Sequence, residues 1–276
     1  MSARLFAALR LPVLAALTLV LAAPATAATT PPGLNLRWDT CYDDGGTSNK
    51  LFACNTNTGA NSLTLSFVLD APMAPVEGME IRMEIWSSSA SLPAWWNMKD
   101  AGTCRSTALG LNTIVNPSAT NCVDWSAGQS AGGIGAYTIG FSGPNMAMVL
   151  IATAVPASAL AALDPDQEYF IANVTIGHAK TIGTGACAGC DVPVCIVFSQ
   201  LNVTTPDIAN NRRFIGGANG IESQLATWQN GLPVNPHILN IGVTGGGPRM
   251  SMDGCVLDPS TGTNRSTWGS VKSLYR

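Results

Sequence analysis

The sequence predicts an all-β protein, an antiparallel β-sandwich with a short C-terminal helix, on three observations. Apolar residues alternate with a period of two in most patterned segments. Clusters of Gly, Pro, Asn and Asp separate these segments, as turns separate strands. Charged residues make up only 11% of the chain, against roughly 25% in an average soluble domain. The helices of about 10–15 residues that a βαβ fold needs between its strands are missing from the pattern.

The N-terminus predicts a secretory signal peptide over residues 1–27. Arg4 and Arg10 are basic, the apolar run Leu11–Ala23 is shorter than the roughly 20 residues that span a bilayer, and Ala25–Ala27 is a cleavage site of small residues. The alternative is an N-terminal membrane anchor. We expect a β-sandwich domain over 28–248, a tail over 249–276 and no membrane span in the mature chain. The protein is then secreted or periplasmic after cleavage near Ala27.

The clearest strand is residues 79–86, where apolar and charged side chains alternate. Ile81 and Met83 should be buried, and Glu80, Arg82 and Glu84 exposed, as in a strand with one face in water. Further strands are expected at 63–69, 137–141, 146–153, 169–176 and 193–203, with weaker ones at 34–38 and 225–229.

Two short helices are expected. Pro156–Leu163 is rich in alanine and leucine and ends at Asp164-Pro165. Near the C-terminus, apolar residues recur every three or four positions, which predicts a helix that docks on the sandwich or serves as a sorting tag. These apolar residues are Trp268, Val271, Leu274 and Tyr275.

All eight cysteines follow the predicted signal peptide, and an even number in an exported protein indicates disulfides. Cys41 and Cys54 bracket one turn-rich loop, and Cys104 and Cys122 bracket another, so we expect these two pairs. The last four cysteines allow three pairings, and the spacing does not choose among Cys187, Cys190, Cys195 and Cys255.

The candidate ligand-binding residues are aromatic. Trp95 and Trp96 follow Pro93, and on a loop both rings would offer flat stacking surfaces for a sugar. Asp124 and Trp125 add a carboxylate and a further ring. The alternative is that one Trp packs in the core, where aromatic side chains contribute most to stability.

Catalytic and metal signals are weak. Gly128–Gly132 matches G-x-S-x-G but lacks the strand-to-helix setting of a nucleophile elbow. Asp39, Asp43 and Asp44 crowd one loop and form a weak calcium candidate, with a solvated turn as the alternative. We expect no cofactor and no catalytic residues, and the sequence favours a non-enzyme over an enzyme.

Two resemblances bear on function. The segment from Cys187 to Val197, CAGCDVPVCIV, and the ending TWGSVKSLYR resemble segments of uncharacterised secreted bacterial proteins, which imply no known activity. The order of strands from Tyr137 to Val203 resembles cohesin-type sandwiches, so the fold is expected to be cohesin-like or jelly-roll-like. That likeness implies a binding or scaffolding module, with no binding residues to carry over.

Charge limits the class of partner. The formal net charge is −3 and the pI is near 5.3, which excludes an electrostatic grip on nucleic acid. The sequence therefore predicts a secreted, disulfide-stabilised, non-catalytic binding, adhesion or surface-structural protein, whose partner is an extracellular protein or glycan. The alternative is a carbohydrate-binding or carbohydrate-active protein.

Overall fold

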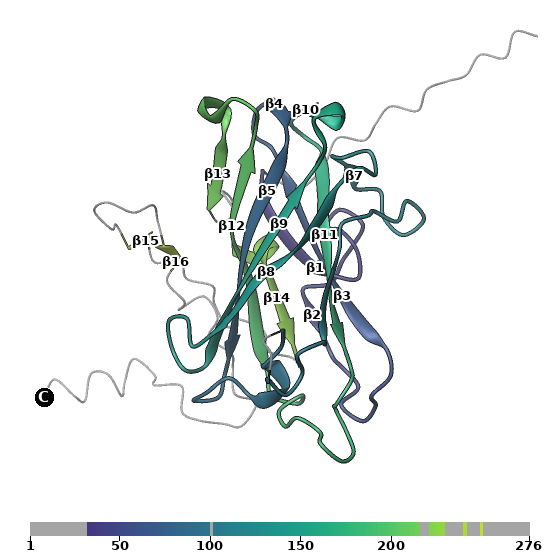
Figure 1. Cartoon of the computed structure of the whole chain (residues 1–276), viewed down its shortest axis with the longest axis vertical. Helices are drawn as coiled ribbons and strands as arrows, with labels where there is room; N and C mark the ends of the chain where they lie inside the picture. Colours follow the sequence, from purple (N-terminus) through teal and green to yellow (C-terminus); the bar gives the residue numbers. More distant parts are fainter. Residues whose placement is uncertain (1–31, 100–101, 216–220, 230–239, 242–248, 251–276) are drawn as a thin grey trace, which may run out of the picture.

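The chain folds into an antiparallel β-sandwich, shown in Figure 1. This computed structural model describes residues 32–99, 102–215, 221–229, 240–241 and 249–250. The predicted signal peptide and C-terminal helix lie outside these residues, as does the tail from 251 onward. Among the described residues, no helix is long and apolar enough to cross a membrane.

The first sheet has the strand order β1-β3-β11-β6, and a short β7 runs parallel to β11. Asn35 and Arg37 of β1 lie away from the core, while Leu34, Leu36 and Trp38 point into it. The strands are β1 (Gly33–Trp38), β3 (Ala60–Val68), β6 (Leu109–Asn112), β7 (Val123–Asp124) and β11 (Glu168–Gly177).

The second sheet has the order β2-β14-β12-β5-β9-β8, and β13 also pairs with β12. One edge of β12 is shared: Val194–Val197 pair with β14 and Gln200–Val203 pair with β13, with a bulge in the β12–β5 ladder between Phe198 and Gln200. The strands are β2 (Asn49–Lys50), β5 (Gly78–Ser87), β8 (Ala131–Ile139), β9 (Met146–Ala154), β12 (Val194–Thr204), β13 (Arg212–Ile215) and β14 (Leu225–Trp228).

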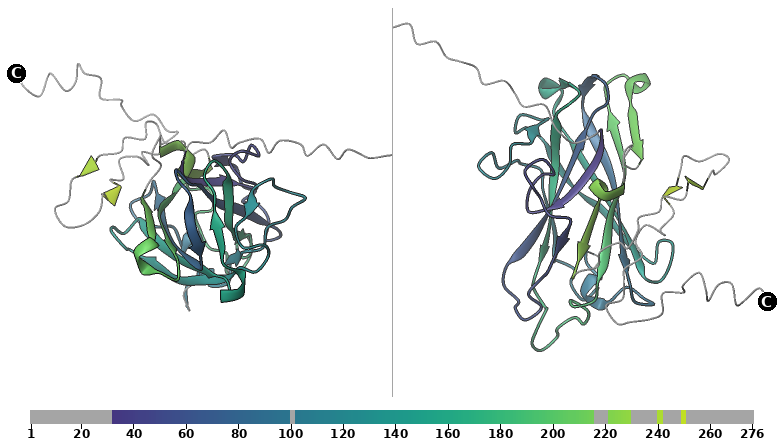
Figure 2. Two further views of the ribbon diagram at one scale, coloured as in Figure 1. Left: turned by 90° about the horizontal axis from the view of Figure 1, so that it is seen from above. Right: turned by 180° about the vertical axis from the view of Figure 1, so that it is seen from behind.

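Smaller elements complete the described fold. Two short ladders join β4 (Met73–Val76) to β10 (Ala161–Leu163), and β15 (Asn240–Ile241) to β16 (Arg249–Met250). The views in Figure 2 show the two large sheets around one interior. The single-turn 3-10 helices are η1 (Ala94–Trp96), η2 (Ala157–Ala159), η3 (Ile208–Asn210) and η4 (Ile221–Gln224).

The predicted strands are confirmed to within three residues at each end, except at the start of β8. β8 begins at Ala131, six residues before the expected start, because its first half contains glycines that leave no alternating pattern. Gly132 is required there: a Cβ would lie 2.4 Å from the carbonyl oxygen of Ala152 on β9.

The helix predicted at Pro156–Leu163 is wrong. The structure has a single 3-10 turn and then β10, whose residues Ala161 and Leu163 pair with Val76 and Met73 of β4. Only Leu163 is buried in this segment, so a helix here would have no apolar stripe to pack.

The orientation of β5 is confirmed in part. Ile81 and Met83 are buried in the core and Glu80 is exposed, as expected. Glu84 is buried instead of exposed, and its Oε1 lies 2.6 Å from Nη2 of Arg82. The neighbouring side chain on β12, Val197, is also buried although it lies on the outer face of the sheet.

The predicted disulfides Cys41–Cys54 and Cys104–Cys122 are wrong. The structure pairs Cys41 with Cys122, Cys54 with Cys190 and Cys104 with Cys187. Each bridge joins segments far apart in the sequence, because strand pairing brings distant loops close together. Cys195 is also disulfide-bonded.

Candidate functional site

The structure buries both tryptophans of the predicted aromatic platform. Trp95 and Trp96 lie in η1 with no exposed surface. The indole N–H of Trp95 donates to Oγ1 of Thr181, and both rings pack against Trp228. The expectation of exposed stacking surfaces was therefore wrong, since a 3-10 turn lets adjacent side chains enter the interior together.

This aromatic cluster encloses a buried arginine. The guanidinium carbon of Arg105 lies 3.5 Å from the ring centre of Trp95, and its N–H groups donate to the carbonyls of Trp95, Gly177 and Ala179. Burial lowers the pKa of Arg105 to about 10, against a smaller opposing effect of Tyr137. Arg105 therefore closes the end of the core by satisfying backbone carbonyls.

Gly189 allows close packing of two loops at the same end of the core. The peptide hydrogen of Trp95 bonds to the carbonyl of Ala188, in the loop that carries Cys187 and Cys190. Gly189 has φ +97°, and a Cβ on it would lie 2.3 Å from Cβ of Pro93. Gly189 of the CAGC segment therefore lets this loop approach the loop of Pro93 closely. The two cysteines of the segment form disulfides with Cys104 and Cys54.

Asp124 and Trp125 also have structural roles. Trp125 is 3% exposed. The Asp124 carboxylate accepts from the N–H and hydroxyl of Ser126 and from the N–H of Gly128, at 2.7–2.9 Å. Asp124 thus caps the turn before β8, and the G-x-S-x-G match runs through this turn into a strand.

The carboxylates of the weak calcium candidate do not converge on one point. Asp39 is paired with Lys50. Asp44 accepts hydrogen bonds from Thr40, Thr120 and both nitrogens of Asn121. Burial would raise the pKa of Asp44, but the hydrogen bonds from Thr120 and Asn121 together lower it. Among the described residues, these carboxylates form no metal-binding group.

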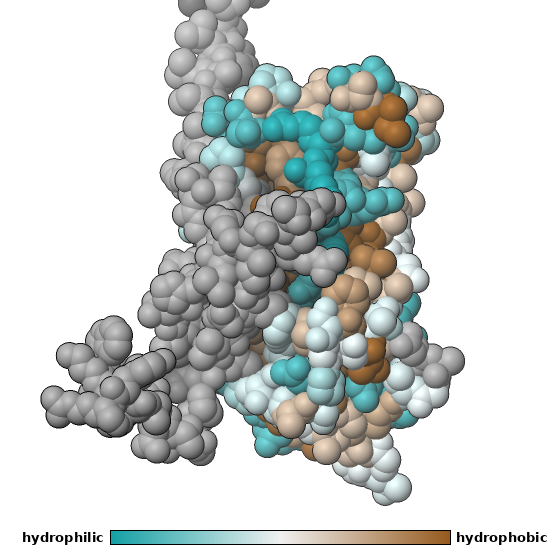
Figure 3. Space-filling model, turned by 90° about the vertical axis from the view of Figure 1, so that its left-hand side faces the viewer, coloured by the Kyte–Doolittle hydropathy of each residue, from teal (hydrophilic) through white to brown (hydrophobic). Residues whose placement is uncertain are grey.

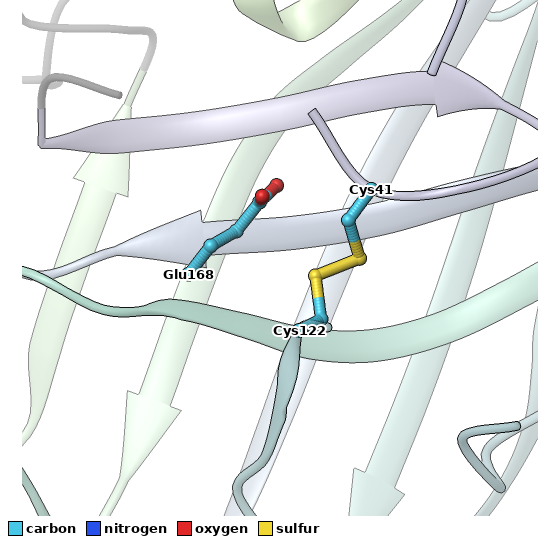
Figure 4. A group of neighbouring side chains, drawn as sticks. All are labelled: Cys41, Cys122 and Glu168. Carbon is cyan, nitrogen blue, oxygen red and sulfur yellow. A yellow bond between two sulfur atoms is a disulfide. The ribbon is translucent and has the colours of Figure 1, made fainter. Parts of the chain in front are cut away.

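Glu168 is a buried carboxylate that sequence reasoning missed. It lies beside the Cys41–Cys122 disulfide, as Figure 4 shows. It accepts from Asn35, Ser66 and the backbone N–H groups of Tyr42 and Asp43. Burial raises the pKa of Glu168, although the hydrogen bonds from Ser66, Asp43 and Tyr42 act in the opposite direction. The disulfide sulfurs are not thiolates, so this group is not a metal site.

A cleft of about 360 Å³ opens where the edges of the two sheets meet, between β1 and β13. Arg212 is paired with Asp70 and donates to the carbonyl of Ala71 at 3.1 Å. Its guanidinium carbon lies 5.2 Å from the ring centre of Phe214. Pairing with Arg212 lowers the pKa of Asp70. The cleft is lined by Pro32, Gly33, Val68, Asp70, Arg212, Arg213, Phe214 and Ile215.

Arg213 gives the cleft a positive charge that Asp70 does not balance. It is exposed, and its Nη2 donates to Oε1 of Gln200 at 2.6 Å. Hydrophilic surface is concentrated in the upper half of the side shown in Figure 3, the side on which β13 lies in Figure 1. The signal in the sequence was the adjacent Arg212-Arg213 in a chain with only 14 lysines and arginines.

Comparisons with known proteins do not assign this chain to a family. No protein-family model matches it, and no curated protein sequence matches it significantly. One similar solved structure is the collagen-binding subdomain of the Enterococcus faecalis surface protein ACE, with 11% identity, covering 66% of this chain and 94% of that one. Its TM-score is 0.23, and a likeness this small carries no argument about function.

Proposed function

We propose that this protein is an exported, non-catalytic binding protein, and that the cleft between β1 and β13 receives an acidic saccharide. The observation that carries the proposal is the lining of the cleft, which includes two arginines, one aspartate and an aromatic residue. Arginine binds carboxylate and sulfate groups with two parallel hydrogen bonds. Asp70 can accept from sugar hydroxyls.

The size and shape of the cleft favour a small ligand. Small-molecule sites fall at roughly 300–1,000 Å³, and this cleft is within that range. Stable protein–protein interfaces instead bury roughly 800 Å² on each partner. A short stretch of an acidic glycan matches both the volume and the charge.

Three of the other described carboxylates have structural roles, which supports a non-catalytic function. Glu168 and Asp44 are occupied by hydrogen bonds that fasten loops, and Asp124 caps a turn. Three disulfides in the described residues are typical of a protein that folds in an oxidising compartment. These features support export and binding, the reading that the composition also favours.

A glycan array with uronate-containing and sulfated sugars, followed by titration of the hits, tests this function. Arg213→Glu should abolish binding of acidic glycans, because it reverses the charge that Asp70 leaves unbalanced. Lys99→Glu makes the same change in net charge at an exposed residue outside the cleft and should bind like the parent protein. Equal binding by the two variants, or release of sugar products, contradicts the proposal.

A further inference from the structure

Three apolar residues on β12 and β14 are buried on the outer face of the second sheet, away from the core between the sheets. Cys195 and Val197 lie on β12 opposite Trp86 and Glu84 of β5, and Leu225 of β14 lies opposite Val197. We call Cys195, Val197 and Leu225 the outer strip. Their relative exposures are 0%, 2% and 3%.

The orientation follows from the alternation of side chains along a strand. Ile196 and Phe198 on β12 and Ala226 and Trp228 on β14 belong to the core, so the residues between them point outward. Glu80, on the same face of β5 as Glu84, is exposed. The strip therefore lies on the face that is solvated elsewhere in this sheet.

Other outward residues of the sheet show what an uncovered position looks like. Leu150 on β9 lies in register with Arg82 and is 39% exposed. Val197 is about as apolar, yet it is almost inaccessible. A two-layer sandwich leaves such a position in water unless large side chains on the same face or a further segment of chain cover it.

The disulfide chemistry identifies a segment that can cover the strip. Cys195 is disulfide-bonded, and the three bridges described above use six of the eight cysteines. The remaining cysteine is Cys255. It lies shortly after β16, in a terminal segment that carries the apolar residues Trp268, Val271, Leu274 and Tyr275.

We propose that residues 251–276 of this chain dock on the outer strip and are fastened there by a Cys195–Cys255 disulfide. The apolar residues of the tail cover Val197 and Leu225. The tail is then a third layer of the folded body, and its attachment depends on an oxidised cysteine pair. This inference does not depend on the ligand proposed for the cleft.

Peptide mapping of the full-length oxidised protein under non-reducing conditions is the first test. A monomer in which the peptide of Cys195 is linked to that of Cys255 supports the proposal. A link between Cys195 residues of two copies overturns it and makes a second copy the occupant.

Carbene footprinting of the full chain tests the docking itself. Labelling of Val197 and Leu225 should rise severalfold in Cys195→Ala/Cys255→Ala and in Leu274→Asp, while Leu150 and the core residue Leu36 keep their labelling. If labelling of Leu36 also rises in the double cysteine variant, that variant has lost its fold. The labelling of Leu274→Asp then decides whether the tail covers the strip. Unchanged labelling of the strip in a folded variant, or labelling that rises when the parent protein is diluted, overturns the proposal.

Discussion

At the scale of single residues, buried charged and polar groups hold the loops to the sandwich. Arg105 satisfies three carbonyls at one end of the core, and Glu168 accepts four hydrogen bonds near β1. Each would be costly to bury without its partners. Such residues stand out in the structure and not in the sequence, because their partners come from distant segments.

Glu168 should give the stability of the protein a specific pH dependence. Burial raises the pKa of its carboxyl above the ordinary value of 4.5, so the folded state binds the proton more tightly than the unfolded state. The contribution of Glu168 is therefore fully present below pH 4.5 and is lost as the pH rises through the folded-state pKa.

Melting temperatures of the parent and Glu168→Gln between about pH 4 and about pH 8 measure this effect. Glutamine keeps an acceptor for Asn35, Tyr42 and Ser66 and removes the titration. The parent should lose stability relative to the variant as the pH rises. A parent that gains on the variant with rising pH would falsify the assignment.

At the scale of elements, β5 shows how far a strand pattern can be trusted. Its period of two correctly placed Ile81 and Met83 in the core, because alternation follows from the geometry of any strand. The pattern was wrong for Glu84, because burial on the outer face depends on tertiary neighbours that the pattern of β5 does not contain.

Two substitutions on one face of β5 measure this difference. Glu84→Lys removes the partner of Arg82 at a buried position and should lower the free energy of unfolding by about 2–4 kcal/mol. Glu80→Lys makes the same change in charge at an exposed position and should cost less than about 1 kcal/mol. Urea denaturation compares them, and equal costs would mean that Glu84 is solvated.

At the scale of the whole molecule, the disulfides join segments that the strands bring together. Cys187 and Cys190 both lie in the segment between β11 and β12, and each fastens it to a different loop, through Cys104 and Cys54. Cys41–Cys122 fastens the loop after β1 to the segment before β7. The long connections are thereby held at both ends of the first sheet.

Removal of two bridges with matched loop lengths tests what the disulfides contribute. Cys41–Cys122 and Cys104–Cys187 span sequence separations of 81 and 83 residues. Each double Cys→Ser variant should lose about 2–5 kcal/mol, and chain entropy predicts that the two losses agree within about 1 kcal/mol. Chemical denaturation measures both. A larger difference would show that native contacts, such as those of Glu168 beside Cys41, outweigh the loop entropy.

The sequence alone determined the fold class, the positions of the main strands and the presence of disulfides. These follow from local patterns: alternation along a strand, turn residues between strands and an even number of cysteines. Only the tertiary structure decided which cysteines pair, that Trp95 and Trp96 are both buried, and that Asp70 meets Arg212 in a cleft. Each of those facts depends on which distant strands become neighbours, and local periodicity carries no information about that choice.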